Sequence, residues 1–446
     1  MALLAAVLQG CGVYQKYSKA TDVVKDLFGD EYASVDTTSI ATLSWREFFT
    51  DPKLRDLIDS VLVRNTDLRM AHIRVEQAEA SLFAARLAFL PSVGLSGEGA
   101  VARWDGQNSK TYNLGANASW ELDIFGRVRN AKMESKSALE GSQAYEQAVR
   151  TSLVATVAST YYSLLMLDEQ LAINERTLEN WDKTVSAMKS LMKAGYFNKT
   201  AVLQAEANKM ALEQAVLSVK QSISETEKSM CSLLAMTPGS IERGVLEGQT
   251  FPQELSVGLP VSLLANRPDV RQAEAQLAQA FYAVGSARSA FYPSLNLSGA
   301  AGWTNNGGGM VVNPGDLLLN MAGSLAQPLF NEGANVANLK IAKAEQEAAL
   351  LAFRQKLLDA GAEVNNSLTS WQTARKRLEI GEKRIESLKE AVQKTERLMK
   401  HSSVNYLEVL TAQQSLLSAE ESQVQDRYEE IRSVIALYQA LGGGWR

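Results

Sequence analysis

Residues 153–192 read LVATVASTYYSLLMLDEQLAINERTLENWDKTVSAMKSLM and lie within a longer stretch, 128–192, that contains no proline. Mostly apolar residues recur in it at steps of three and four, which is typical of a coiled coil, where each helix keeps one stripe against a partner. The stripe consists of Leu153, Val157, Thr160, Leu164, Leu167, Leu171, Asn174, Leu178, Trp181, Val185, Met188 and Met192. About 65 residues at a rise of 1.5 Å per residue predict a helix of roughly 100 Å, longer than the core of a compact domain.

The composition excludes several classes of protein. The 446 residues carry 45 basic and 50 acidic side chains, a net charge of −5, and such a balance does not predict a nucleic-acid partner. The two cysteines, Cys11 and Cys231, are too few for a disulfide framework. The two histidines, His72 and His401, are far apart in the sequence and have no cysteine or clustered acids at ligand spacing nearby. No metal site and no cofactor are therefore predicted.

Sequence motifs of common catalytic sites are also absent. The sequence contains no Gly-x-x-x-x-Gly-Lys-Ser/Thr, since the lysine is missing after Gly307-Gly308-Gly309, and it contains neither His-Glu-x-x-His nor a nucleophile elbow. The many charged residues of the long helical stretches are typical of solvated helix faces. The sequence therefore does not predict an enzyme.

The first residues resemble part of a bacterial lipoprotein signal. An apolar run, 1–8, is followed by Gln9-Gly10-Cys11, and in such signals a small residue precedes the cysteine that becomes acylated. No lysine or arginine precedes the run, and Gln9 is unusual there, so an unmodified cysteine is the alternative. We expect Cys11 to be lipidated, with 1–11 as the signal remnant and 12–50 as an extended arm.

The hydrophobic period changes from 3.5 to 2 after residue 92. Between Tyr112 and Asp123, apolar residues at even positions alternate with polar residues at odd positions. A strand of 9–11 residues with one apolar face is what a membrane-spanning β-strand requires. The sequence predicts strands at 93–103 and 111–122, joined by a polar turn over 105–110.

The whole arrangement then occurs a second time, about 205 residues later. The stretch FLPSVGLSG at 89–97 reappears as FYPSLNLSG at 291–299. The first half, 51–236, is predicted to contain a helix from Pro52 that ends before Pro91, strands 93–103 and 111–122, a long helix 128–192, and a helix 200–236. A connector, 237–261, leads to the second half, 262–440, with a helix, strands 295–304 and 317–326, a long helix 334–400, a helix 405–440, and a tail 441–446.

Four membrane strands cannot close a barrel, and an open sheet edge cannot face lipid. Two copies would supply eight strands, whose interior side chains fill, whereas three would supply twelve strands and room for a lumen. The polar strand faces carry Asn, Ser, Gly and Glu, which favours a watery interior. A soluble coiled coil with a β insert is the alternative, but it does not explain the apolar strand faces.

Five stretches carry a resemblance to a known family. They are Trp120–Arg127 (WELDIFGR), Asn266–Glu274 (NRPDVRQAE), Phe291–Ser294 (FYPS), Gln327–Phe330 (QPLF) and Leu441–Trp445 (LGGGW). In this order they resemble the signature stretches of the TolC-like outer-membrane efflux channels, the outer-membrane factors of tripartite pumps. The resemblance implies a mainly α-helical chain with membrane β-strands, and a homotrimer whose twelve-stranded β-barrel continues into a periplasmic α-barrel. It also implies a Gram-negative outer-membrane location in contact with lipid, a periplasmic adaptor (membrane fusion protein), and a proton-driven inner-membrane transporter.

The resemblance further implies that the ends of the two helical hairpins meet the adaptor. The residues at these tips are Gly195, Tyr196 and Phe197 in the first half and Ser402, Ser403 and Val404 in the second. Glycine is favoured where a helix ends with a positive φ, and Gly195 is predicted to have that conformation. Plain helical turns without a docking role are the alternative.

A pore aperture is implied at Leu407, Thr411 and Gln414. In many relatives the helix after the second tip has Leu, Asp and Arg at these positions, and these residues narrow the pore. Spacings of four and three place the three residues on one helical face, so three copies form a ring. The charged pair is replaced here by Thr and Gln, so the ring is predicted to close through leucine contacts and neutral hydrogen bonds. The alternative is that Leu407 and Gln414 belong to the coiled-coil seam.

The predicted function is a passive outer-membrane exit duct for drugs, bile-like detergents or other toxic small molecules. A type I protein-secretion channel or a metal-efflux channel is the alternative within the family. A structural spacer between the outer membrane and the cell wall is the alternative from another class. The substrate itself is not determined by the sequence.

Overall fold

The computed structural model describes residues 14–18, 43–196, 198–251, 267–304, 317–400 and 406–444. These residues form two compact units. The first contains the described residues of 1–24, 72–145 and 269–356, and the second contains those of 25–71, 146–268 and 357–446. In chain order the elements are α2 (Trp45–Phe48), α3 (Pro52–Arg64), α4 (Thr66–Leu87), β1 (Ser92–Trp104), β2 (Gln107–Leu122), α5 (Arg127–Lys193), α6 (Lys199–Leu233), α8 (Pro268–Ser289), β3 (Ser294–Thr304), β4 (Leu317–Ala326), α9 (Ala334–Lys400) and α10 (Tyr406–Ala440).

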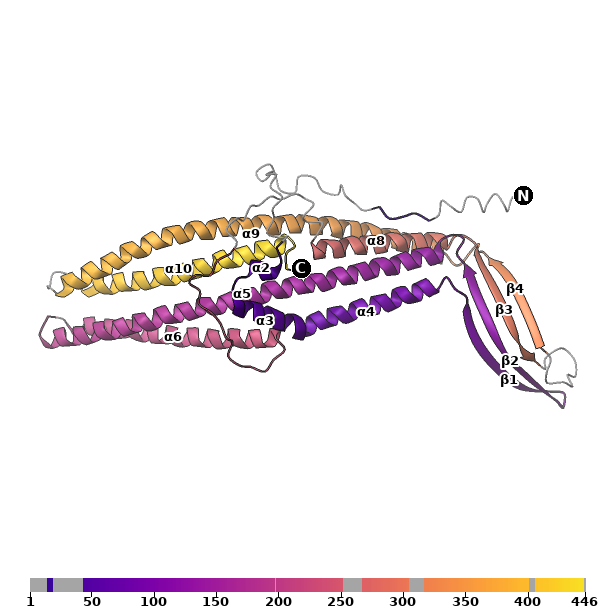
Figure 1. The fold of residues 1–446 in the computed structure, drawn as a ribbon, viewed down its shortest axis with the longest axis horizontal. Coiled ribbons are helices and arrows are strands. Elements are labelled where there is room, and N and C mark those ends of the chain that lie inside the picture. The colour runs from indigo at the N-terminus through magenta and orange to yellow at the C-terminus, as the bar shows by residue number, and fades with distance from the viewer. Residues whose placement is uncertain are drawn as a thin grey trace. The chain divides into compact units, whose positions relative to one another are not determined.

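The first unit contains a four-stranded antiparallel sheet in the order β1-β2-β3-β4 (Figure 1). The turn from β1 to β2 consists of Asp105 and Gly106 alone, with φ values of 49° and 77°. Two consecutive positive φ angles are those of a type I′ turn, for which Asp-Gly is a favoured pair. The predicted turn over 105–110 is therefore wrong. The second strand begins at Gln107, four residues earlier than expected, so the paired strands continue up to the two-residue turn.

The pairing register keeps apolar and polar residues on opposite faces of the sheet. One row across the four strands consists of Leu95, Ala116, Ala301 and Leu319. The adjacent row on the other face consists of Gly94, Asn117, Ala300 and Asn320. A slip of one residue at any pairing would exchange the two faces. The alternation predicted for a single strand therefore extends across the whole sheet.

A glycine pair marks crowding on the polar face. Gly115 and Gly302 lie directly opposite each other in β2 and β3. A Cβ atom on Gly302 would lie 2.4 Å from the carbonyl oxygen of Leu114, closer than non-bonded atoms can approach. A side chain on Gly302 would meet the backbone of β2, so glycine allows the two strands to approach closely here.

The predicted single helix from Pro52 to Pro91 is divided at Asn65. The backbone of Asn65 is extended, with φ −61° and ψ 131°, and its side-chain oxygen accepts hydrogen bonds from the amides of Asp67 and Leu68 at 2.9 and 3.1 Å. Asn65 thus ends α3 and caps α4, because an asparagine oxygen satisfies amides that the first helical turn leaves unpaired.

The second unit contains the C-terminal parts of α5 and α9 together with α6 and α10. The C-terminal part of α5 lies beside α6, and that of α9 lies beside α10 (Figure 1). Ion pairs between α5 and α6 join Glu175 to Lys220 and Asp182 to Lys209. The predicted ends of α5, α6, α9 and α10 differ from those observed by at most three residues. No helix in the described ranges is long and apolar enough to span a membrane.

An aromatic cluster forms the core of the second unit near α2. The rings of Phe48 and Tyr438 stack with centroids 4.0 Å apart and an interplanar angle of 8°. The expectation of an extended arm over 12–50 is wrong for α2, which Ser44 and Glu47 start with a capping box. Ser-x-x-Glu is a helix-start signal that is visible in the sequence. Residues 14–18, another described part of the arm, contain no helix or strand.

Candidate channel wall, aperture and helix tips

The polar face of the sheet is a candidate channel wall. It carries amides, hydroxyls and carboxylates at Glu98, Asn113, Asn117, Ser119, Glu121, Asn296, Ser298, Asn320 and Ser324. Such groups hydrogen-bond with water, while the opposite face exposes Val93, Leu95, Leu114, Leu319 and Met321. An apolar outer band and a polar interior are the two surfaces that a membrane channel requires.

The stretch Trp120–Arg127 joins this wall to α5. The indole nitrogen of Trp120 donates to the carbonyl oxygen of Phe89 at 2.9 Å. The guanidinium of Arg127 binds the carboxylate of Glu121, and this hydrogen bond raises the pKa of Arg127. Asp123 accepts hydrogen bonds from the first amides of α5, a favourable position for a carboxylate. The residues of this stretch thus fix where the strand ends and the helix begins.

Arg267 and Gly442, which belong to two other stretches quoted for the resemblance, lie close together in the second unit. Arg267 is buried, and its guanidinium donates to the carbonyl oxygen of Ala440 at 2.8 Å and to Glu363 at 2.6 Å. Gly442, with φ 86°, follows the end of α10 directly beside Arg267. A cation at the carbonyl end of a helix is favourable because it satisfies carbonyls that have no helical partner.

The aperture residues Leu407, Thr411 and Gln414 all lie on one exposed face of α10. Leu407 is 53% exposed, whereas Leu410 and Leu417 of the same helix are buried. The hydroxyl of Thr411 donates to the carbonyl oxygen of Leu407 at 2.7 Å, so it is satisfied within its own helix. The structure thus brings the three residues together, outside the buried seam of this chain.

Ion pairs behind this face attach α10 to two other helices. Glu420 binds Arg176 of α5 at 3.1 Å and Lys389 of α9 at 3.5 Å. Asp426 is buried and binds Arg377 of α9 at 2.6 Å. Sequence reasoning did not find these pairs, since their members are far apart in the chain and have no local signal.

The first helical tip is a tight turn between α5 and α6. Gly195 has a φ of 84°, as predicted, and its amide donates to Met192 O at 3.0 Å. The amide of Tyr196 donates to Leu191 O at 2.9 Å, which completes a Schellman motif. Tyr196 is exposed, and Asn198 caps α6. The other predicted tip residues, Phe197, Ser402, Ser403 and Val404, lie outside the described residues.

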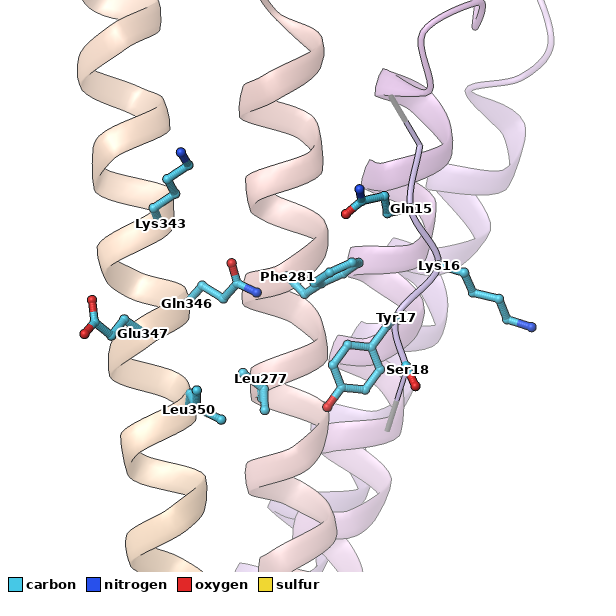
Figure 2. A pocket seen from close by; sticks show the side chains of 10 residues that line it. All are labelled: Gln15, Lys16, Tyr17, Ser18, Leu277, Phe281, Lys343, Gln346, Glu347 and Leu350. Carbon is cyan, nitrogen blue, oxygen red and sulfur yellow. The ribbon is translucent and has the colours of Figure 1, made fainter. Parts of the chain in front are cut away.

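A segment near the N-terminus packs on the first unit beside a groove. In Figure 2, α8 lies between residues 14–18 and α9. The ring of Tyr17 contacts Phe281 edge to face at 5.6 Å, and Arg129 lies 5.0 Å from the ring of Tyr14. Burial raises the pKa of Tyr17 to about 12. The groove of about 850 Å³ is lined by Gln15, Lys16, Tyr17, Ser18, Leu277, Phe281, Lys343, Gln346, Glu347 and Leu350. Cys11 itself lies outside the described residues.

The described parts of the chain contain no group of three or more His, Cys, Asp or Glu side chains arranged to hold a metal ion. Cys231 is a free, buried thiol. Its sulfur lies 3.5 Å from the carbonyl oxygen of Gly239.

Comparison with known proteins extends over nearly the whole chain. The model of the outer membrane efflux protein family matches residues 57–235 and 259–443. The cation efflux system protein CusC of Escherichia coli O6:H1 is 29% identical, with 99% of this chain and 98% of that protein covered. The probable efflux pump outer membrane protein TtgC of Pseudomonas putida is 27% identical, with 100% and 95% covered. The open-state crystal structure of the MtrE outer membrane channel of Neisseria gonorrhoeae has a TM-score of 0.86 and 30% identity, and covers 97% of this chain and 98% of that one.

Proposed function

This chain belongs to the outer membrane efflux protein family, and we propose that it is the passive exit duct of a tripartite pump that expels toxic small molecules. The predicted family, the predicted fold class and the outer-membrane location are confirmed. The observation that carries the proposal is the sheet, with one apolar and one polar face in register across all four strands. Family membership also supports the prediction that the protein is not an enzyme.

We propose that three copies assemble around one lumen. The four strands of one chain supply only part of a barrel wall, and backbone groups at a sheet edge cannot remain unpaired in lipid. Twelve strands enclose a lumen, whereas the interior of an eight-stranded barrel is filled by side chains. The polar face, with its asparagine and serine side chains, is suited to a water-filled interior.

A tripartite arrangement supplies the energy that a passive duct lacks. We assign the adaptor contacts to the helical tips, where Gly195 and Tyr196 form an exposed turn. A bulky charged residue at Phe197 or Val404 should abolish efflux while the trimer stays intact. Normal efflux in both variants would contradict docking at the tips. The inner-membrane transporter is then reached through the adaptor and is proposed to be proton-driven.

The exposed stripe of Leu407, Thr411 and Gln414 is proposed to narrow the duct. Leu407→Ser should raise the single-channel conductance in planar bilayers and make cells more sensitive to large antibiotics. Leu203→Ser on α6 is the matched control, because Leu203 is 52% exposed and Leu407 is 53% exposed. Unchanged conductance and unchanged sensitivity for Leu407→Ser would refute the aperture. A wild-type protein without any conductance would instead favour a structural spacer.

The aperture also predicts how conductance depends on pH. None of its three side chains titrates between pH 5 and 8, so closure should change little over that range. A steep change would contradict this ring and indicate another, with Glu408 and His401 as the first residues to substitute.

Metal cations are the second candidate substrate, favoured by the similarity to a cation efflux system protein. Growth of a strain without this gene should be compared on hydrophobic drugs and detergents and on a panel of metal salts. Hypersensitivity to drugs and detergents alone supports the small-molecule duct. Hypersensitivity to the metal salts alone would replace it by the cation duct, and loss of a secreted protein would favour type I secretion.

Acylation of Cys11 is proposed as a second attachment to the outer membrane. The described segment begins at Tyr14, which packs against Gly126 at the junction of β2 and α5. Cys11 precedes Tyr14 by three positions in the sequence. Mass spectrometry of the protein from cell envelopes should find an acylated N-terminal cysteine, and Cys11→Ser should prevent processing. A mature N-terminus without lipid mass would refute the proposal.

A further inference from the structure

We infer the register in which neighbouring copies join: β4 of one copy pairs antiparallel with β1 of the next, with Met321 opposite Val101. This inference rests on the proposed trimer and specifies its membrane interface. In the described sheet, β1 pairs only with β2 and β4 pairs only with β3. Successive strands alternate in direction, so β4 beside the β1 of a second copy makes an antiparallel pair, as between every other pair of neighbours.

The internal repeat relates this junction to one that the structure contains. The two halves of the chain each contribute a hairpin, so the β4–β1 junction between copies corresponds to the β2–β3 junction within a chain. The FLPSVGLSG and FYPSLNLSG stretches align β1 with β3, from Ser92 to Ser294, a shift of 202 residues. Ser92 pairs with Ser119, and Ser294 pairs with Ala326. Hence Ser119 of β2 corresponds to Ala326 of β4, a shift of 207 residues.

These two shifts convert the observed pairs into pairs between copies. Within the chain, Leu114 of β2 lies opposite Trp303 of β3. The shift of 207 residues takes Leu114 of β2 to Met321 of β4. The shift of 202 residues takes Trp303 of β3 back to Val101 of β1, so Met321 lies opposite Val101. The same operation converts the observed pair Gly115–Gly302 into Ala322–Ala100.

The side chains at the derived junction agree with this register. Met321 and Val101 are both exposed on the apolar face, so lipid-facing residues meet lipid-facing residues. A slip of one residue would place Met321, on the apolar face, opposite Ala100 or Ala102, which lie on the polar face. The derived register places Glu98 opposite Ser324, so that two polar side chains face each other. A slip of two residues, with Met321 opposite Gly99, would place Glu98 opposite Ala322.

Disulfide formation between cysteines introduced on the two edges measures this register. Residues directly opposite each other have Cβ atoms about 4.5–5.5 Å apart, and diagonal neighbours are about 7–8 Å apart. A disulfide requires a Cβ separation of about 3.5–4.5 Å. Cross-linking should therefore be strongest for the pair that is directly opposite.

Three double variants of the full chain are compared: Val101→Cys, Gly99→Cys and Arg103→Cys, each combined with Met321→Cys. After mild oxidation of outer membranes, covalent dimers and trimers are counted on a denaturing gel without reductant. We expect at least fivefold more cross-linked product for Val101→Cys with Met321→Cys than for the other two pairs. The single variants and the wild type, which retains buried Cys231 and the Cys11 that we propose to be acylated, should give none.

Each outcome has a separate meaning. A stronger cross-link from Gly99→Cys or Arg103→Cys would overturn the register and indicate a slip of two residues. An intact trimer, shown by native mass, without a cross-link from any pair would overturn the β4–β1 junction. The same membranes, assayed for native mass and efflux under reducing conditions, test the proposed function independently. A monomeric protein there would refute the trimer as well as the register.

Discussion

Replacing Arg243 by alanine should destabilise the second unit, because this side chain joins three segments. Its Nε and Nη2 atoms donate to Asp168 of α5 at 2.5 and 3.0 Å. Its Nη1 atom donates to Glu227 of α6 at 2.6 Å and to the carbonyl oxygen of Ile241 at 2.9 Å. The hydrogen bonds to Asp168, and then those to Glu227, raise the pKa of Arg243, so it remains charged under all ordinary conditions.

The size of the loss follows from how much water reaches each partner. The side chain of Glu227 is 18% exposed and that of Asp168 is 37% exposed. Glu227 cannot rehydrate fully, and losing a hydrogen bond to a charged group costs about 1.5–3 kcal/mol. Asp168 can rehydrate, which limits its share to about 0–1 kcal/mol. Arg243→Ala should therefore reduce the free energy of unfolding by about 3 kcal/mol.

Denaturant unfolding of the protein in detergent, followed by the circular dichroism of the helices, measures this change. Arg46→Ala is the control in the same unit, because Arg46 pairs with Asp59 where the two side chains are 59% and 48% exposed. Such a surface pair contributes about 1 kcal/mol or less. Arg243→Lys should fall between the two variants, since lysine keeps the charge but not the planar fork. An Arg243→Ala variant no less stable than Arg46→Ala would refute the reasoning.

Three further predictions test the sheet, the tip and the core. Leu114→Arg on the apolar face should cost about 2–4 kcal/mol and reduce trimer yield in membranes, whereas Asn117→Arg on the polar face should be mild; equal yields would refute the assignment of the faces. Gly195→Ala should cost about 1–2 kcal/mol at the end of α5 because φ is positive there, and should speed amide exchange in its last turn. Gly239→Ala is the control, because φ is not positive at Gly239, and it should not speed amide exchange in the last turn of α5. Equal exchange rates in the two variants would contradict the role of Gly195. Burial raises the pKa of Tyr438 to about 12. Its neutral form therefore stabilises the fold below pH of about 10, the unfolded value, and this stability is lost as the pH rises toward 12. The free energy of unfolding, measured between pH 10 and 12, should fall less steeply with pH in Tyr438→Phe than in the wild type. An unchanged slope would count against this role of Tyr438.

Local sequence patterns were sufficient for the helices and strands themselves. The 3.5-residue spacing in 153–192 and the two-residue alternation in 112–122 each depend on neighbours along the chain. Two of the boundaries that differ from expectation also have a local signal in the sequence. Asp105-Gly106 is a favoured two-residue hairpin turn, and Ser44-x-x-Glu47 is a helix start. Asn65 had no such signal, because an asparagine within an amphipathic pattern is also compatible with a continuous helix.

The candidate sites were accessible from the sequence only in part. The spacing of Leu407, Thr411 and Gln414 predicted a shared helical face, and the structure places them on one. Whether that face belongs to the buried seam depended on what packs against α10. The exposure of Leu407 and the burial of Leu410 and Leu417 decide this. The ion pairs of Glu420 with Arg176 and Lys389 join α10 to helices that are separated from it by many residues in the chain.

The sequence by itself determined the period of each segment, the duplication of the chain and the residue types on each strand face. These properties follow from backbone geometry and from side-chain polarity, both of which act over a few residues. Only the tertiary structure decided the register between β2 and β3 and the partners of Arg243 and Arg267. These contacts join residues dozens to hundreds of positions apart, and they are selected by the combined packing and hydrogen bonding of whole elements, which no local pattern encodes.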